Sequence, residues 1–412
     1  MSWLQFAVWG AYLTSMGGYL SKVGLGENIG WFYSVQGIVS IFMPAIMGLI
    51  ADRWVPAQRL LGLCHLCSAL AMLYIGYIGS SLRETVTFRD IFPMYSIAVA
   101  LYMPTYALSN SVSYTALEKA GLDTIKDFPP IRVFGTIGFI VSMWIVDLLG
   151  LQHPSSQFYA SGIWGLILTL YTFTLPHCPT LKESTTSAKD LFGLKSFALL
   201  KNSKMRLFFI FSMLLGASLQ ITNSYANPYI SAFAIDETYT DSFFVQHANI
   251  LISLSQISET LCILLIPFVL QRFGIKNVML MSMIAWFFRF GLFAVGNPGF
   301  PGVLSLILSM IVYGIAFDFF NISGSLFVDK KTDPSARSSA QGLFMLMTNG
   351  LGATFGTLCA QLVVNHFVYS ETDTTLILSG WRYSWMIFAF YAACICFLFA
   401  ILFKTKNPTY KE

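Results

Sequence analysis

The chain has 412 residues, of which 56% are hydrophobic and 11% are charged, and its formal net charge is +4. Soluble domains usually carry charges on roughly 25% of their residues, so the composition excludes an ordinary soluble protein and indicates a polytopic membrane protein. The basic residues follow the connections between apolar segments and form no patch, which argues against a nucleic-acid partner.

Twelve apolar segments follow one another along the chain. A helix of about 20 residues crosses a hydrocarbon core of roughly 30 Å, and each segment is long enough to do so. We predict spans at residues 4–23, 29–50, 60–79, 91–116, 129–149, 157–175, 205–232, 243–270, 276–296, 302–326, 338–366 and 381–403. The predicted fold class is therefore an all-α membrane protein with twelve transmembrane helices.

The distribution of Lys and Arg predicts the orientation in the membrane. If the N-terminus is cytoplasmic, most of the 24 Lys and Arg fall on the inside. The outside loops then hold only Lys22, Arg83, Arg89 and Arg382. Because cytoplasmic loops carry the excess of Lys and Arg, we expect both termini to be cytoplasmic.

The longest inside connection divides the spans six and six. We expect an N-terminal bundle over residues 1–175, a cytoplasmic linker over 176–204, a C-terminal bundle over 205–403 and a cytoplasmic tail over 404–412. In the linker, apolar residues between positions 191 and 200 alternate with Lys189, Lys195 and Lys201, a pattern typical of a short amphipathic helix on the membrane surface.

A charged connection at residues 48–59 follows the second predicted span. It contains Gly48, Asp52 and Arg53, and a weaker echo at residues 267–276 follows the eighth span. The first connection resembles the Gly-x-x-x-Asp-Arg loop signature of the major facilitator superfamily, although Val55 replaces its usual central glycine. The resemblance implies two pseudo-symmetric six-helix bundles and a conformational role for this loop.

Four Asp, Glu, Lys or Arg residues lie inside predicted spans and more than two residues from a span end: Arg132, Glu259, Arg289 and Asp318. Charged groups are costly in lipid, so they face a cavity or a partner. Two cations and two anions can also neutralise each other. For Arg289 and Asp318, which lie on consecutive spans, we favour this pairing.

Arg132 lies near the start of the fifth predicted span. Thr136 and Phe139 follow it at helical spacing, so the three side chains share one face. An arginine fork beside a hydroxyl and an aromatic ring suits a planar polar solute, through paired hydrogen bonds and stacking.

Polar side chains also repeat on the seventh and eighth spans. Gln220, Asn223 and Asn227 are spaced by three and four residues, and Pro228 is expected to break or kink this helix. One face of the eighth span carries Gln246, Asn249, Ser253, Gln256, Glu259 and Thr260. Such stripes bind a solute or form hydrogen bonds between helices.

Tyr313 and Phe317 lie one turn apart in the tenth span, beside Asp318 and Asn321. Core packing and a binding site are equally good interpretations of this aromatic pair.

Several longer strings of residues resemble the nucleoside:proton symporters of the same superfamily. They lie at residues 4–6, 9–10, 127–139, 219–223, 246–248, 255–260, 274–278 and 313–324. The resemblance implies a nucleoside site at Arg132, Thr136, Phe139, Gln220, Asn223, Gln256, Glu259, Tyr313 and Phe317. Departures at Ser218 and at residues 224–230 leave purine and pyrimidine nucleosides as alternatives.

The resemblance implies a proton-coupled nucleoside importer of the bacterial cytoplasmic membrane, with nucleosides such as uridine and protons as partners and a monomer as the functional unit. Alternating access about a site at the membrane midplane is the expected mechanism. A carboxyl group whose hydration changes between states can load and release a proton. Glu259 is the favoured coupling residue and Asp318 the next candidate.

Three other function classes are weaker. A sugar or drug carrier of the superfamily fits the architecture but not the strings that contain Gln256 and Glu259 or Gln220 and Asn223. An uncoupled nucleoside facilitator is a further alternative. A membrane enzyme would need a nucleophile and base or metal ligands, and the five histidines show no such spacing. A receptor would be expected to carry a soluble signalling domain. The seven cysteines predict neither a disulfide nor a metal site, and we expect no cofactor.

Overall fold

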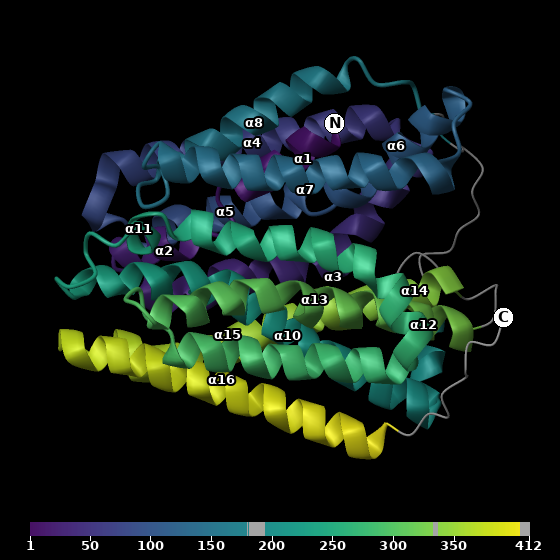
Figure 1. The fold of residues 1–412 in the computed structure, drawn as a ribbon. Coiled ribbons are helices and arrows are strands. Elements are labelled where there is room, and N and C mark those ends of the chain that lie inside the picture. Colours follow the sequence, from purple (N-terminus) through teal and green to yellow (C-terminus); the bar gives the residue numbers. More distant parts are fainter. Residues whose placement is uncertain (179, 181–193, 333–336, 404–412) are drawn as a thin grey trace. The chain divides into compact units, whose positions relative to one another are not determined.

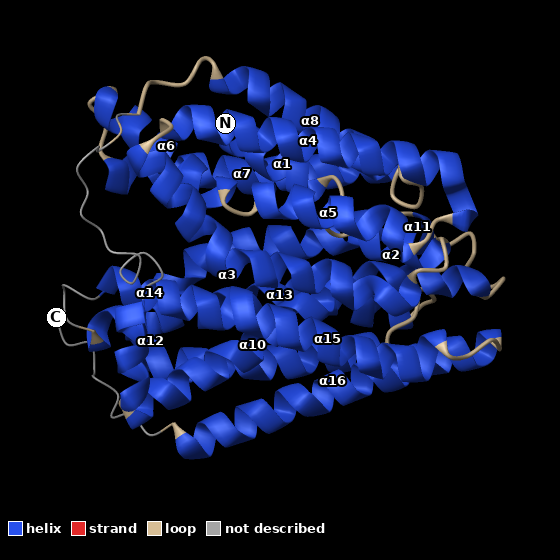
Figure 2. Cartoon of the chain, turned by 180° about the vertical axis from the view of Figure 1, so that it is seen from behind, coloured by secondary structure: helices blue, strands red, loops and turns tan. Residues whose placement is uncertain are grey.

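The computed structural model describes residues 1–178, 180, 194–332 and 337–403. All regular elements among these residues are helices, which confirms the predicted all-α fold (Figure 2). The chain divides into two compact units, Met1–Phe192 and Gly193–Glu412 (Figure 1). The first part of the predicted amphipathic helix in the linker, residues 189–193, lies outside the described residues, and the rest is a 3₁₀ helix, η3 (Leu194–Lys201).

The first unit is a bundle of α-helices joined by short turns. Its helices are α1 (Ser2–Gly10), α2 (Met16–Lys22), α3 (Ile29–Arg53), α4 (Ala57–Leu82), α5 (Phe88–Tyr102), α6 (Thr105–Lys119), α7 (Thr124–Leu148) and α8 (Ser156–Thr172), with 3₁₀ turns η1 (Gly26–Asn28) and η2 (Arg83–Thr85).

The second unit contains longer helices and two π-helical segments. Its elements after η3 are α10 (Ser203–Ala232), η4 (Phe233–Ile235), α11 (Phe243–Gln246), α12 (Ala248–Val295), α13 (Gly302–Lys331), α14 (Arg337–Met345), the π-helix η6 (Leu346–Gly352), α15 (Ala353–Val364), the π-helix η7 (Asn365–Tyr369) and α16 (Thr374–Leu402).

Nine helical stretches of the described residues are long and apolar enough to cross a membrane. One of them, α12, contains two predicted spans. They are separated at Gly274, whose φ of 74° and ψ of 163° are not helical. The predicted first span is divided into α1 and α2, and α8 has only 17 residues. These features account for the difference from the twelve predicted spans.

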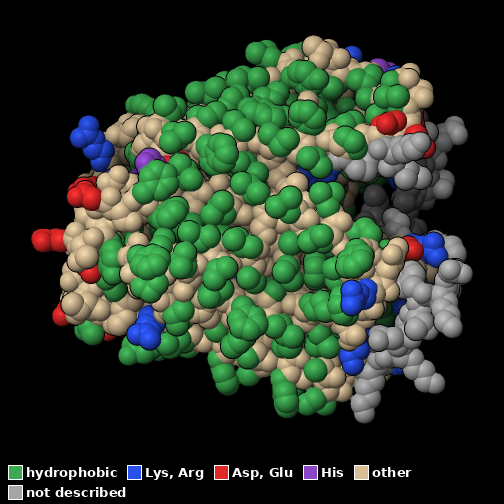
Figure 3. Space-filling view, in the orientation of Figure 1, with side chains coloured by type: hydrophobic (Ala, Val, Ile, Leu, Met, Phe, Trp, Pro, Cys, Tyr) green, Lys and Arg blue, Asp and Glu red, His purple; other side chains and the backbone are tan. Residues whose placement is uncertain are grey.

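The surface of the helices fits a hydrocarbon solvent. On α12, Leu261, Leu264, Leu265 and Phe268 are all more than half exposed. Figure 3 shows hydrophobic side chains along the helices and charged ones near the helix ends. Exposed leucines on an α-helix whose other side chains are packed are what a lipid-facing surface requires.

A buried polar network holds α1 in the first unit. The Gln5 side chain donates to the Thr105 hydroxyl at 2.7 Å and accepts from His65 Nε2, also at 2.7 Å. The Tyr102 hydroxyl donates to the backbone carbonyl of Gln5 at 2.6 Å. These bonds join α1 to α4, α5 and α6, so the residues next to Gln5 have a fixed position.

One local expectation was wrong. The eighth predicted span does not begin as one helix, because α11 ends at Gln246 and α12 starts at Ala248, with His247 in a non-helical conformation between them. Of the break or kink expected at Pro228, the structure excludes the break, because α10 continues to Ala232.

Candidate functional site

Arg132 lies on α7 and is half-buried against aromatic rings. Its guanidinium carbon is 4.2 Å from the centre of the Phe6 ring and 5.5 Å from that of Tyr106. Arg132 Nη2 donates to the Tyr106 hydroxyl at 2.8 Å. A guanidinium group has five N–H donors, so most of them have no protein acceptor among the described residues. The two rings hold the cation while leaving its donors available.

Glycines bring α1 into backbone contact with α7 at this point. A Cβ added at Gly135 would lie less than 3.0 Å from the Phe6 ring, and one at Gly138 would lie as close to the carbonyl of Trp3. Gly10 on α1 is equally close to the Phe139 carbonyl. Because Gly135 has no side chain, the Phe6 ring fits against α7 beneath the Arg132 guanidinium group.

Thr136 and Phe139 differ in their exposure. Thr136 is half-buried on the same helix as Arg132, as the spacing predicted. Phe139 is only 6% exposed, and its ring packs edge-on to Trp9 with the centroids 6.2 Å apart. In this conformation the Phe139 side chain is packed inside the first unit.

The amides of α10 divide into two groups. Asn223 Nδ2 donates to Gln220 Oε1 at 3.2 Å, and both side chains are half-buried. Asn227 is fully buried and donates to Asn249 of α12 at 3.0 Å. The alternative of hydrogen bonding between helices is therefore correct for Asn227, whereas Gln220 and Asn223 bond to each other within one helix.

Tyr313 is the centre of a polar cluster in the second unit. Its hydroxyl forms a hydrogen bond with the side chain of Gln256, and Glu259 and Asp318 lie close enough to act on it electrostatically. The rings of Tyr313 and Phe317 are stacked, with centroids 5.9 Å apart and planes 14° apart. α12 and α13 thus bring together five of the predicted site residues.

The two carboxylates of this cluster differ in accessibility. Asp318 is 3% exposed, whereas Glu259 is half-buried on the face of α12 that also carries Gln256 and Thr260. The Glu259 carboxyl group can therefore exchange a proton with water more easily than the Asp318 carboxyl group.

The predicted ion pair between Arg289 and Asp318 is wrong within the described residues. Arg289 Nη1 instead donates to the backbone carbonyl of Ser309 at 2.6 Å and to the hydroxyl of Ser255 at 3.4 Å. Arg289 Nε donates to the hydroxyl of Thr222, also at 3.4 Å. Its guanidinium carbon lies 4.5 Å from the centre of the Tyr313 ring. Arg289 is 1% exposed, and it connects α10, α12 and α13 behind the cluster.

The residues of the predicted conformational loop lie at the end of α3. Gly48, Asp52 and Arg53 belong to the last two turns of this helix, and the connection to α4 consists of the three residues after Arg53. A side chain added at Gly48 would meet no atom within 4 Å.

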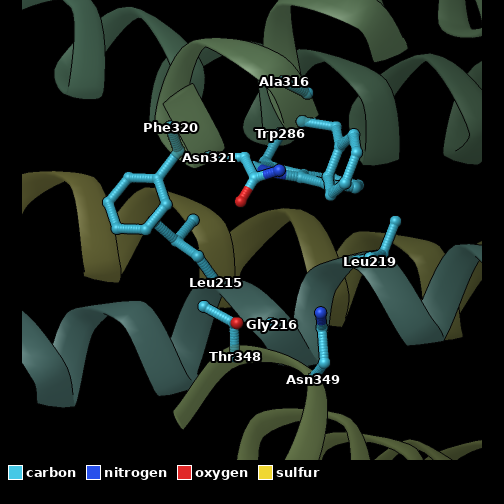
Figure 4. Close-up of a pocket in the computed structure, with 10 residues that line it drawn as sticks. Leu215, Gly216, Leu219, Trp286, Ala316, Phe320, Asn321, Thr348 and Asn349 are labelled. Atoms are coloured by element: carbon cyan, nitrogen blue, oxygen red, sulfur yellow. The ribbon is translucent and has the colours of Figure 1, made fainter. Parts of the chain in front are cut away.

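Sequence reasoning missed a recess in the second unit. Leu215, Gly216, Leu219, Trp286, Ala316, Phe317, Phe320, Asn321, Thr348 and Asn349 line it (Figure 4). Asn321 lies one turn after Phe317, and this spacing was a signal that could have extended the site. Thr348 and Asn349 belong to a π-helix, which no periodicity indicated.

Among the described residues, no group of three or more His, Cys, Asp and Glu is placed to hold a metal ion. The seven cysteines are all free thiols.

Comparison with known proteins identifies relatives over the full length of the chain. A family model described as the nucleoside H⁺ symporter matches residues 1–408. The chain is 46% identical to the nucleoside permease NupG of Escherichia coli strain K12, over 99% of this chain and 95% of that protein. It is 48% identical to the xanthosine permease of the same strain, over 100% and 96%.

A solved structure agrees with these sequence relatives. The crystal structure of the nucleoside transporter NupG, solved as a point mutant, matches with a TM-score of 0.92 at 46% identity and covers 98% of both chains.

Proposed function

This chain belongs to the nucleoside H⁺ symporter family, and from that premise we propose how its side chains bind a nucleoside and a proton. The chain is a multi-pass inner-membrane protein with the fold of major facilitator transporters, and it imports nucleosides together with protons. Its relatives are permeases, so it is a transporter and not an enzyme.

Nine polar and aromatic residues bind the nucleoside in this proposal. The first unit contributes Arg132, Thr136 and Phe139, and the second contributes Gln220, Asn223, Gln256, Glu259, Tyr313 and Phe317. The observation that carries this assignment is the cluster around the buried Tyr313, which combines amide, carboxylate and stacked aromatic groups on two adjacent helices. Amides and a carboxylate suit sugar hydroxyls and base edges, and aromatic rings suit the base plane.

Glu259 carries the coupling proton. It lies half-buried beside Tyr313, whereas Asp318 is almost fully buried. A nucleoside is uncharged at neutral pH, so the membrane potential acts on transport through a proton held by the protein. One proton crossing about 100 mV supplies about 2.3 kcal/mol, enough for about a 50-fold gradient of a neutral solute.

The transport cycle is alternating access, in which the two units move relative to each other around the site. Residues at the end of α3, including Gly48, Asp52 and Arg53, act in the switch between states. Both termini are cytoplasmic, and a single chain is the working unit.

Uptake of labelled uridine into proteoliposomes tests the function. We expect saturable uptake that an inward proton gradient drives above equilibrium and that other nucleosides compete away. Uptake that reaches equilibrium but never exceeds it would indicate an uncoupled facilitator. Inhibition by sugars and not by nucleosides would indicate a carrier for another polar solute.

A further inference from the structure

The recess between α10, α12, α13 and η6 has the size of one small polar group. Its cavity volume is about 20 Å³. A buried water needs roughly 10–15 Å³ measured in the same way, together with two to four polar partners. The recess therefore has room for one water molecule or one hydroxyl group.

Three polar side chains point into the recess from opposite sides. In Figure 4, the amide of Asn321 on α13 faces Thr348 and Asn349 of η6. The Thr348 hydroxyl donates to the carbonyl of Phe344 at 2.9 Å, which leaves its lone pairs to accept. Asn349 Nδ2 has only a 3.4 Å contact with the sulfur of Met345.

Asn321 is the decisive residue of the recess. Its side chain is half-buried and forms no hydrogen bond with any of the described residues. An amide can donate two hydrogen bonds and accept two. The amide atoms of Asn321 are not fully buried, so a partner that enters the recess can reach them. The amide is therefore placed for a partner that the protein itself does not supply.

Glycines and the π-helix η6 determine the position of the side of the recess that faces Asn321. A Cβ on Gly216 of α10 would clash with the carbonyl of Thr348, and one on Gly352 would clash with the carbonyl of Met213. η6 therefore lies against α10 with backbones in contact. π-helical turns occur often at functional sites, because the widened turn re-aims the side chains around it.

The recess continues the aromatic face of the proposed nucleoside site. Tyr313, Phe317 and Asn321 follow one another at intervals of four residues on α13, so they lie on one side of the helix. Phe317 is both the stacking partner of Tyr313 and a wall of the recess. No lining residue is charged, which disfavours a phosphate or carboxylate group as the occupant.

We propose that this recess binds one ribose hydroxyl of the transported nucleoside, with Asn321 and Asn349 as its hydrogen-bonding residues. The inference rests on the proposed function and extends its site by one turn of α13. Water fills the recess in the empty transporter, and the ribose hydroxyl replaces it with the same pattern of donors and acceptors.

Competition binding with nucleoside analogues tests the proposal. The purified full-length protein is incubated with labelled uridine and with 2′-deoxyuridine, 3′-deoxyuridine or 5′-deoxyuridine as competitors. In the wild type we expect one of the three to bind about 10-fold more weakly than uridine, because a buried donor or acceptor then loses its partner. In Asn321→Ala we expect uridine itself to weaken by about that factor and the same analogue to bind as well as uridine.

Two further variants complete the design. Asn349→Ala is expected to remove the same discrimination, and it serves as the second probe if Asn321→Ala fails to fold. Asn277→Ala is the matched control, because Asn277 is an exposed amide of α12 outside the recess, and it should keep the wild-type pattern.

The outcomes separate this subsite from the transport function. Wild-type discrimination among the three analogues in both Asn321→Ala and Asn349→Ala would overturn the subsite alone. A wild-type protein that binds no uridine would overturn the proposed function, and the subsite with it.

Discussion

Arg132 in the first unit and Arg289 in the second are both guanidinium groups within membrane helices, but their surroundings differ. Arg132 is half-buried and donates one hydrogen bond, to Tyr106, among the described residues. Arg289 is 1% exposed, and its donors are directed at a backbone carbonyl and two hydroxyls. Each lies over an aromatic ring, at 4.2 Å for Arg132 and 4.5 Å for Arg289.

The difference shows that a charge in a membrane helix has two separate uses. A cation whose donors are taken by the protein holds helices together, whereas a cation held by ring faces keeps its donors for a ligand. Sequence position gives no means of separating the two. The free donors of Arg132 and the occupied donors of Arg289 predict different consequences of mutation.

The largest effect is expected for Glu259→Gln. If Arg132 binds the solute and Arg289 stabilises the fold, the group that carries the coupling proton is a carboxylate. Gln has nearly the shape of Glu, but it has no carboxyl group that could gain or lose a proton. We expect the accumulation ratio of uridine under about 100 mV to fall from about 50-fold to equilibrium, while exchange of uridine across the membrane persists. Undiminished accumulation in proteoliposomes would assign the proton to Asp318 instead.

Arg132→Ala should weaken nucleoside binding by about 10-fold to 100-fold, since hydrogen bonds from a charged group contribute about 1.5–3 kcal/mol. Arg132→Lys should recover only part of the affinity, because an ammonium group cannot reproduce the planar fork. Equilibrium binding of labelled uridine measures both variants. Their melting temperatures should match the wild type, and wild-type affinity in Arg132→Ala would remove this residue from the site.

Arg289→Ala should lower the free energy of unfolding by about 3 kcal/mol, because the Ser309 carbonyl loses its donor and a cavity opens beside Tyr313. The melting temperature in detergent, followed by tryptophan fluorescence, measures the loss. Arg289→Met is the matched control that fills the space without donating, so its stability should lie between those of the wild type and Arg289→Ala. An unchanged melting temperature in Arg289→Ala would make the two arginines alike.

The smallest effect is expected for a charge outside the membrane. Asp373 caps α16 and accepts from the hydroxyl and the backbone N–H of Thr375 at 2.7 and 2.8 Å. These bonds lower the pKa of the Asp373 carboxyl below its ordinary value of 3.8. Its stabilising contribution is therefore present above that pH and is lost as the pH falls through the lowered pKa. Asp373→Ala should melt slightly lower than the wild type at pH 7 and equally at the most acidic pH that the wild type survives.

Hydropathy predicted most of the fold, because the length of an apolar segment determines whether it spans the bilayer. The break that hydropathy predicted between the eighth and ninth spans coincides with Gly274, which has a positive φ within α12. Hydropathy failed at the first span, which is divided at residues 11–15, because this break does not change the hydrophobicity of the segment.

The candidate site was predicted in part. Spacing along one helix correctly grouped Gln256 with Glu259 and Tyr313 with Phe317. Spacing could not identify Phe6 and Tyr106 as the neighbours of Arg132, since they come from other helices. The Ser309 carbonyl that binds Arg289 was also unpredictable, because every residue has such a carbonyl and sequence gives no sign of which one is used.

The glycine contacts between α1 and α7 also limit how the first unit can move. Gly135 and Gly138 receive atoms of α1, and Gly10 receives the carbonyl of Phe139, so each helix carries notches that fit the other. Sliding either helix by one residue would drive a side chain into backbone. The two helices therefore cannot slide along each other. Any change in the orientation of Arg132 during transport must move α1 and α7 together.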